Sequence, residues 1–130
     1  MNRLEAKVYI VGAGPGDPDL ITVKGQHILQ NADVVLYTDS LVSEELIAQA
    51  HPEASVRKSS GMDLEQIVDL MVTHVRQGKS VARVHTGDPA VYGAIFEQMV
   101  LLKKENIPVE IVPGVSSVFA AAAVLGAELT

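Results

Sequence analysis

The sequence predicts an α/β fold: an open, mostly parallel five-stranded sheet with helices on both faces. Short runs rich in β-branched residues alternate with segments in which apolar residues recur at helical spacing. This alternation is typical of βαβ units, which build parallel sheets covered on both sides. The 130 residues, 48% of them hydrophobic, are enough for one domain with its own core.

The first half of the chain is predicted to form two βα units. A β-branched run that ends in glycine predicts a strand at 7–11, and the following polar and apolar pattern predicts a helix at 22–30. A second apolar run predicts a strand at 33–37. Ser43 can cap the next helix, at 43–50, because a serine hydroxyl accepts a bond from the first free N–H groups.

The middle of the chain contains the clearest helix. Residues 54–58 are short and charged, which predicts a strand towards an edge of the sheet. In the segment 63–78, Asp63 is the expected N-cap, Gln66 follows three residues later to complete a capping box, and Gly78 ends the helix.

The last part of the chain is predicted to add two strands, at 80–85 and 109–112, and an amphipathic helix at 91–104 between them. The apolar face expected for that helix comprises Ile95, Phe96, Met99, Val100 and Leu102. A final helix is expected at 116–123, and its small residues should allow close packing on the sheet.

Composition and charge argue against several function classes. The formal net charge is −6, with 16 acidic and 10 basic residues, so the positive surface of a nucleic-acid-binding protein is missing. There is no cysteine, and the 4 histidines are not at ligand spacing, so no metal site is expected. No segment approaches the roughly 20 apolar residues of a membrane span, and we expect a cytoplasmic protein.

The predicted ligand site lies outside the carboxyl ends of the strands, where loops lead into helix N-termini. Five segments are expected at that edge: 12–19, 38–43, 59–63, 85–93 and 113–117. Three of them combine glycine with proline, which gives rigid turns whose backbone N–H groups can approach a small molecule. The alternative is that glycine and proline only mark turns, but three such loops on one edge favour a ligand site.

The first loop does not fit a nicotinamide dinucleotide. Gly12 and Gly14 begin a G-x-G pattern after a strand, but the third glycine of G-x-G-x-x-G is replaced by Asp17. Pro15 and Pro18 would also obstruct the helix that must start there.

The charged residues of the edge segments are all aspartates, which do not suit a polyphosphate. A small zwitterionic or cationic ligand fits better, because backbone N–H groups can hold one carboxylate while the acids favour a cation. The alternative for Asp63, Asp17 and Asp19 is that they form caps and Asx-turns.

Three further residues near this edge are given structural interpretations. Tyr92 and Phe96 lie near a helix start and are assigned to the core in preference to a pocket wall. His85 is interpreted as a hydrogen-bonded histidine at a strand end and not as a base.

Together and in this order, the three glycine-proline loops resemble the tetrapyrrole (corrin/porphyrin) methylase family. The segments that carry the resemblance are VYIVGAGPGDPDLITVKG (8–25), ADVVLYTDSLVS (32–43), RVHTGDPAVYGAIFEQM (83–99) and IVPGVSSVFAAAA (111–123). Within the family, DSLVS, GMDLEQ and HTGDPAVYGAIFEQMVLLK are most similar to precorrin-4 or cobalt-precorrin-4 C11-methyltransferases. The alternative within the family is a uroporphyrinogen-III methyltransferase, but these enzymes typically have GGDP where this chain has TGDP, beginning at Thr86.

The resemblance implies an S-adenosylmethionine-dependent enzyme that methylates a tetrapyrrole and is usually a homodimer of two-domain chains. Residues 1–130 would be the N-terminal domain, and the C-terminal domain would be absent, so we suspect a fragment. The alternative function is that of a catalytically silent module for ligand binding or assembly.

The resemblance also implies roles for individual residues. Those matching positions that contact the cofactor in relatives are Pro15, Gly87, Asp88, Val91, Ser116 and Ser117. Asp39 matches an acid proposed as a proton acceptor, and a carboxylate that only orients the substrate remains an equal alternative. Lys58 is the candidate for binding a substrate carboxylate, against the alternative of a solvated charge on an edge strand.

Overall fold

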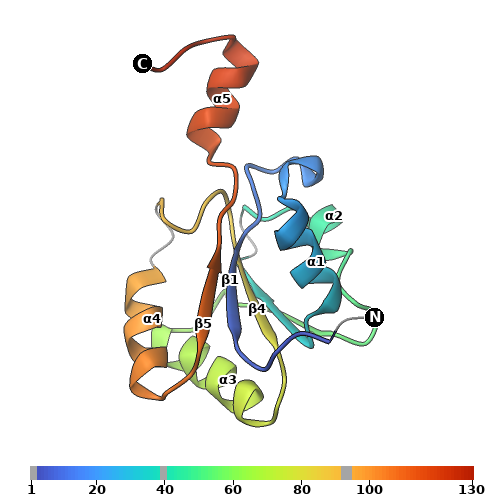
Figure 1. Ribbon diagram of the computed structural model, residues 1–130, viewed down its shortest axis with the longest axis vertical. Coiled ribbons are helices and arrows are strands. Elements are labelled where there is room, and N and C mark those ends of the chain that lie inside the picture. Colours follow the sequence, from blue (N-terminus) through green and yellow to red (C-terminus); the bar gives the residue numbers. More distant parts are fainter. Residues whose placement is uncertain (1–2, 39–40, 92–94) are drawn as a thin grey trace.

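The computed structural model describes residues 3–38, 41–91 and 95–130. These residues contain a five-stranded sheet with the order β3-β2-β4-β1-β5, and all of its strand pairs are parallel (Figure 1). The strands are β1 (Val8–Gly12), β2 (Val34–Tyr37), β3 (Ser55–Lys58), β4 (Val81–His85) and β5 (Val109–Val112). The predicted fold class is therefore confirmed, with each strand within one residue of its expected bounds.

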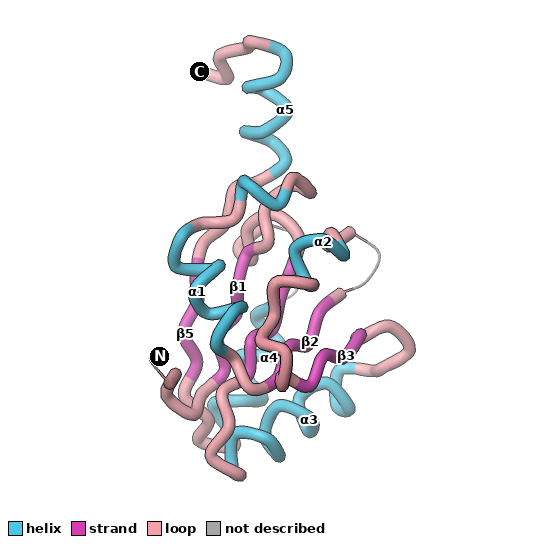
Figure 2. Tube along the Cα trace, turned by 90° about the vertical axis from the view of Figure 1, so that its right-hand side faces the viewer, coloured by secondary structure: helices cyan, strands magenta, loops and turns pink. Residues whose placement is uncertain are grey.

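Helices cover both faces of the sheet, as Figures 1 and 2 show. On one face lie α1 (Val23–Asn31) and α2 (Glu44–Ile47), and on the other lie α3 (Leu64–Arg76) and α4 (Ile95–Lys104). A single turn of 3₁₀ helix (Pro18–Leu20) precedes α1. None of the helices in the described residues is long and apolar enough to cross a membrane.

Alternation along the strands divides the core into two layers. Tyr9 and Val11 face α1 and α2, whereas Val8 and Ile10 face α3 and α4. Both sides of β1, β2 and β4 are buried, so their runs of apolar residues are continuous, as expected for central strands of a parallel sheet.

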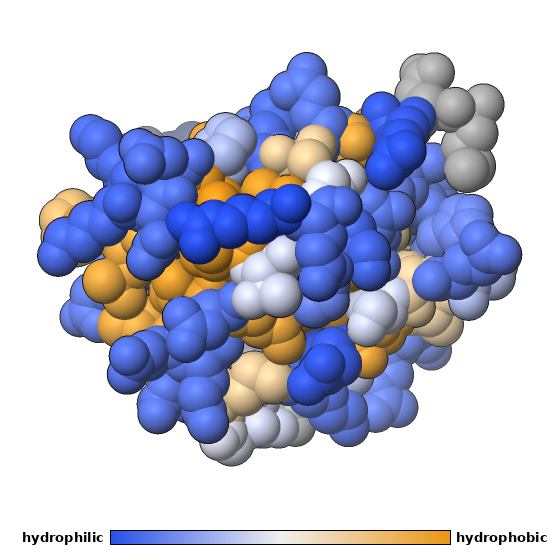
Figure 3. Space-filling model, turned by 90° about the horizontal axis from the view of Figure 1, so that it is seen from below, coloured by the Kyte–Doolittle hydropathy of each residue, from blue (hydrophilic) through white to orange (hydrophobic). Residues whose placement is uncertain are grey.

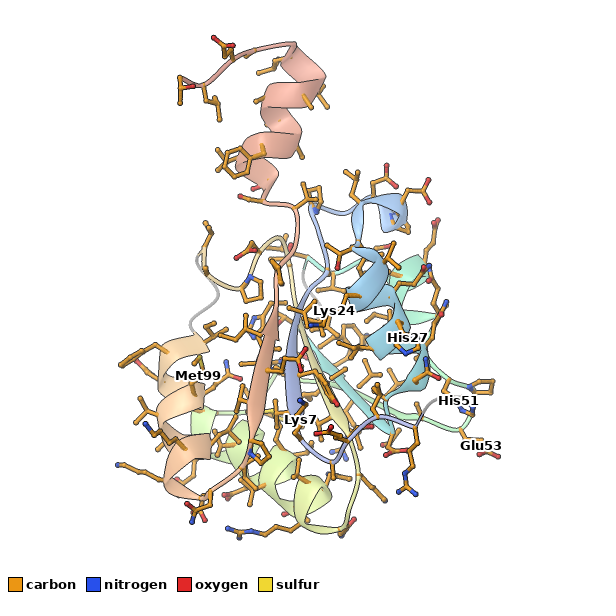
Figure 4. All side chains as sticks on the ribbon, in the orientation of Figure 1. Lys7, Lys24, His27, His51, Glu53 and Met99 are labelled. Atoms are coloured by element: carbon orange, nitrogen blue, oxygen red, sulfur yellow. The ribbon has the colours of Figure 1, made fainter. Side chains whose placement is uncertain are left out.

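The two edges of the sheet differ. All four residues of β3 are exposed, which confirms the predicted edge position. At the other edge, Glu110 of β5 accepts a 2.9 Å bond from Lys7 and lies 2.7 Å from the ammonium of Lys24 on α1 (Figure 4). These two ammonium groups hold the pKa of the Glu110 carboxyl below its ordinary value. The ion pairs thereby tie α1 to the edge strand.

The capping residues of two helices behave as predicted. Asp63 accepts a 2.8 Å bond from the Gln66 backbone N–H while the Gln66 side chain accepts a 2.9 Å bond from the Asp63 N–H, a complete capping box. Ser116 caps the last helix, α5 (Ser117–Leu125), by accepting a 3.2 Å bond from Val118 N–H.

Two expectations about packing are wrong. α5 has no buried residue and projects away from the sheet (Figure 1), so residues 120–123 do not pack on it. The Pro113-Gly114 turn ends β5, and the chain continues outward beyond the sheet edge. In α4, Phe96 is 75% exposed and is not a core residue; the buried positions are Gln98 and Leu102.

Candidate functional site

The three glycine-proline loops follow three neighbouring strands, β4, β1 and β5, and they contact one another at the carboxyl edge of the sheet. Ala13 N–H donates a 2.7 Å bond to the carbonyl of His85. Gly14 and Gly87 then exchange backbone bonds of 3.2 and 2.7 Å, which form an antiparallel bridge beyond the parallel strands. The first and fourth loops are therefore fixed to each other by their backbones.

The Asp88 carboxylate adds the fifth loop to this arrangement. Its Oδ1 accepts a 2.8 Å bond from Ala90 N–H within the same loop. Its Oδ2 accepts a 3.0 Å bond from Gly114 N–H, across 26 residues of sequence. Asp88 thus ties the segment 85–93, here the TGDP loop, to the segment 113–117, here the PGVSS turn. This structural role was not part of its predicted contact with the cofactor.

Glycine is required where the three loops meet because backbone lies against backbone. A Cβ on Gly12 would lie 2.6 Å from the Gly87 carbonyl oxygen and 2.7 Å from the Gly114 Cα, well inside contact distance. Gly87 also has a φ of 61°, in the left-handed region that favours glycine. The result is a cradle with little side-chain cover.

A hollow of about 520 Å³ opens beside this cradle, between the first loop and α5. Its walls include Pro15, Asp17, Leu20, Val115, Ser117 and Phe119. The volume lies within the range of small-molecule sites, and Ser117, the first residue of α5, is one of the lining residues. These features fit a zwitterionic ligand of moderate size, whose carboxylate the helix N-terminus would favour.

The predicted cofactor residues occupy different parts of this region. Pro15 and Ser117 line the hollow. Gly87 lies in the cradle, and Ser116 is only 5% exposed and uses its hydroxyl to cap α5. Val91 is 42% exposed and is not among the residues that line the hollow.

The predicted substrate residues are not brought into the hollow. Lys58 lies on the exposed edge strand β3, and β2 separates β3 from the three strands whose loops form the cradle. Asp39 and Tyr92 lie outside the described residues. Asp17 accepts a 2.9 Å bond from Asp19 N–H, which confirms its interpretation as a local turn and cap residue.

A buried polar cluster below the same edge was not predicted. The Arg83 guanidinium, on a residue only 4% exposed, donates from Nε to Gln98 Oε1 at 3.2 Å and from Nη1 to Ser59 Oγ at 3.1 Å. Burial lowers the pKa of Arg83 to about 10. The available sequence signal was an arginine in the apolar run VARVH, since a charged residue in a central parallel strand requires partners.

His85 belongs to the same region, and its predicted interpretation as a hydrogen-bonded histidine at a strand end is wrong. Its Nε2 is buried and has no hydrogen-bond partner among the described residues. Burial and the positive charge of Arg83 lower its pKa to about 4, so the imidazole is neutral at pH 7. His85 is therefore not the fully hydrogen-bonded histidine that was expected.

Other hollows lie away from the glycine loops. One of about 350 Å³ lies at the amino ends of the strands and includes Arg3, His51 and Glu53 (Figure 4). An apolar groove between α4 and β5 is lined by Phe96, Met99, Val100, Lys103, Ile107 and Val109. Seen from below, the mostly hydrophilic surface is interrupted by apolar residues towards the side of α4 (Figure 3). Neither hollow contains the converging backbone groups of the carboxyl edge.

Residues 7–130 match the family model of the Tetrapyrrole (Corrin/Porphyrin) Methylases. The chain belongs to this family. It is 68% identical over 124 residues to the cobalt-precorrin-4 C(11)-methyltransferase of Priestia megaterium, covering 95% of this chain and 48% of the relative. The chain thus spans about half the length of that tetrapyrrole methylase.

Solved structures of tetrapyrrole methylases agree with the fold. A cobalt precorrin-4 methyltransferase superposes with a TM-score of 0.94 at 67% identity, over 96% of this chain and 52% of that one. A uroporphyrin-III C-methyl transferase from Thermus thermophilus, complexed with S-adenosyl homocysteine, gives a TM-score of 0.77 at 41% identity. That match covers 89% of this chain and 48% of the neighbour.

Proposed function

We propose that these residues form the N-terminal domain of an S-adenosylmethionine-dependent methyltransferase that methylates C11 of precorrin-4 or cobalt-precorrin-4. The observation that carries the proposal is the junction of three glycine-proline loops on adjacent strands, beside a hollow of suitable size. The identity to a cobalt-precorrin-4 C(11)-methyltransferase supports the choice of substrate.

In this proposal the chain acts by holding and orienting the donor. When bound, S-adenosylmethionine supplies a methyl group activated by a positively charged sulfur. Pro15 and Ser117 would contact the cofactor in the hollow, and the positive N-terminal end of the α5 dipole would favour its carboxylate. Alignment of donor and acceptor is the main requirement of an in-line methyl transfer, and it contributes several kcal/mol to lowering the barrier. A rigid backbone cradle meets that requirement with few titratable side chains.

The methyl acceptor, a tetrapyrrole, would lie over the part of the carboxyl edge that the glycine loops leave open. The glycine loops occupy the ends of β4, β1 and β5, so the ends of β2 and β3 remain for the tetrapyrrole. Lys58, at the end of β3, would attract a peripheral carboxylate. Asp39 would either accept a proton that the tetrapyrrole loses, from a position other than C11, once C11 is methylated, or orient the ring, and both roles remain part of the proposal.

Calorimetry with S-adenosylhomocysteine tests the cofactor assignment, and NADH serves as the control for a dinucleotide site. We expect the complete gene product to bind S-adenosylhomocysteine and not NADH. Failure of the complete gene product to bind S-adenosylhomocysteine would contradict the proposal and favour the catalytically silent module.

Product analysis by mass spectrometry tests the substrate. We expect methylation of precorrin-4 or cobalt-precorrin-4 in preference to uroporphyrinogen III. The reverse preference would contradict the C11 assignment while keeping the family's chemistry. Homodimerisation, which rests on the family resemblance alone, is tested on the same preparation by light scattering.

A further inference from the structure

The buried Arg83 side chain connects three separate segments of the fold. Its guanidinium donates to Ser59, the first residue after β3, and to Gln98 on α4, while its backbone belongs to β4. Ser59 in turn donates from Oγ to the carbonyl of Tyr37, the last residue of β2, at 3.3 Å, and from its backbone N–H at 2.9 Å. One side chain thus connects the carboxyl ends of β2, β3 and β4 to α4.

The cost of burial indicates that the position of these donors matters. Among the described residues no carboxylate forms an ion pair with Arg83. Desolvation of a guanidinium that lacks an ion pair is strongly unfavourable, and an apolar residue in a central strand would avoid it. Arginine offers what an apolar residue and lysine do not: a planar fork whose donors reach two partners in fixed directions.

The segments that Arg83 connects adjoin the proposed acceptor side of the site. Ser59 directly follows Lys58 and begins the segment 59–63 at the carboxyl edge. The bonds that hold the glycine cradle together, between Gly14 and Gly87 and between Asp88 and Gly114, do not involve the Arg83 guanidinium. Arg83 therefore holds the segment 59–63, on the proposed acceptor side, and does not hold the glycine cradle.

We propose that Arg83 is a positioning residue for the acceptor substrate: by bonding Ser59 and Gln98 together, it fixes the segment 59–63 and α4 against the strand ends that hold the tetrapyrrole. This inference rests on the proposed methyl transfer. Arg83 acts through these two partners and does not itself touch the reacting atoms.

The test compares Arg83→Lys with the unaltered complete gene product. Lysine keeps the charge but cannot reproduce the two-armed bond. We expect kcat/KM for the tetrapyrrole to fall by about 10- to 100-fold, as small misplacements of a bound substrate do, with S-adenosylhomocysteine affinity unchanged. Arg76→Lys is the matched control, since Arg76 pairs with Glu105 on the surface at 2.8 Å, and it should leave both constants unchanged.

A double-mutant cycle with Ser59→Ala tests whether Arg83 acts through Ser59. We expect Ser59→Ala to raise the tetrapyrrole KM in the unaltered protein and to have little further effect on it when Arg83 is already lysine. Amide hydrogen exchange of this chain gives a readout independent of activity. Ser59 and Met62, whose amides bond Tyr37 and Ser59 carbonyls, should exchange faster in Arg83→Lys, whereas Val72 within α3 should not.

Three outcomes would overturn the inference. One is an unchanged tetrapyrrole kcat/KM and unchanged exchange at Ser59 and Met62. Another is an equal loss of tetrapyrrole and cofactor binding together with thermal stability, because that would make Arg83 a general structural residue. The third is an unaltered protein that does not bind S-adenosylhomocysteine, a result that removes the proposed function itself.

Discussion

Replacement of Asp88 by alanine should damage stability and cofactor binding together. The carboxylate accepts two backbone bonds, 2.8 Å from Ala90 and 3.0 Å from Gly114, and the second joins two loops that are far apart in sequence. A hydrogen bond to a charged group contributes about 1.5 to 3 kcal/mol, and the half-exposed position of Asp88 reduces that value. We therefore expect a loss of about 2 kcal/mol in the free energy of unfolding, measured by urea denaturation.

The same change should weaken S-adenosylhomocysteine binding, because the PGVSS turn would no longer be held against the TGDP loop. We expect at least about a tenfold loss of affinity by calorimetry, equivalent to about 1.4 kcal/mol. Asp33→Ala is a closely matched control. Asp33 is also half-exposed and accepts bonds from Ser80 N–H at 2.9 Å and Ser80 Oγ at 3.2 Å, but at the amino ends of β2 and β4.

Asp33→Ala should lower stability by a similar amount and leave the affinity for S-adenosylhomocysteine unchanged. The reasoning is refuted if both variants lose stability equally and neither loses affinity. That result would mean that the tie between the two loops does not shape the cofactor site.

Three further predictions concern stability. The pKa of His85 is lowered to about 4 from 6.5, so the unfolded state binds more protons between these values and stability falls as pH drops through this window. His85→Gln should remove up to about 3 kcal/mol of the pH dependence of the free energy of unfolding, measured by urea titrations at several pH values. His27→Gln is the control and should leave that dependence in place. Equal slopes of unfolding free energy against pH for the two variants would contradict the assignment. Phe119, 65% exposed on α5, should tolerate serine within about 0.5 kcal/mol by thermal denaturation, whereas a loss above about 1 kcal/mol would place it in a core. Leu102→Ala should cost about 2 to 5 kcal/mol in urea denaturation because Leu102 is 0% exposed, and a smaller loss would show that the α4 layer can collapse around the cavity.

The sequence by itself was sufficient to predict the order of the helices and strands along the chain and to single out the glycine-proline loops. These features are local: strand runs, the Asp63 capping box and the Ser116 cap are each encoded within a few residues. The family resemblance added the expected cofactor and substrate, since its motifs span most of the chain.

Only the tertiary structure decided which loops meet and which residues join them. The order β3-β2-β4-β1-β5 depends on crossovers that no local pattern encodes, and it places the three glycine loops on neighbouring strands. The Asp88 bond to Gly114 and the Arg83 bonds to Ser59 and Gln98 connect residues that are distant in sequence. The outward course of α5 could not be predicted either, because an apolar, alanine-rich helix has the same local pattern whether it packs on its own sheet or projects beyond it.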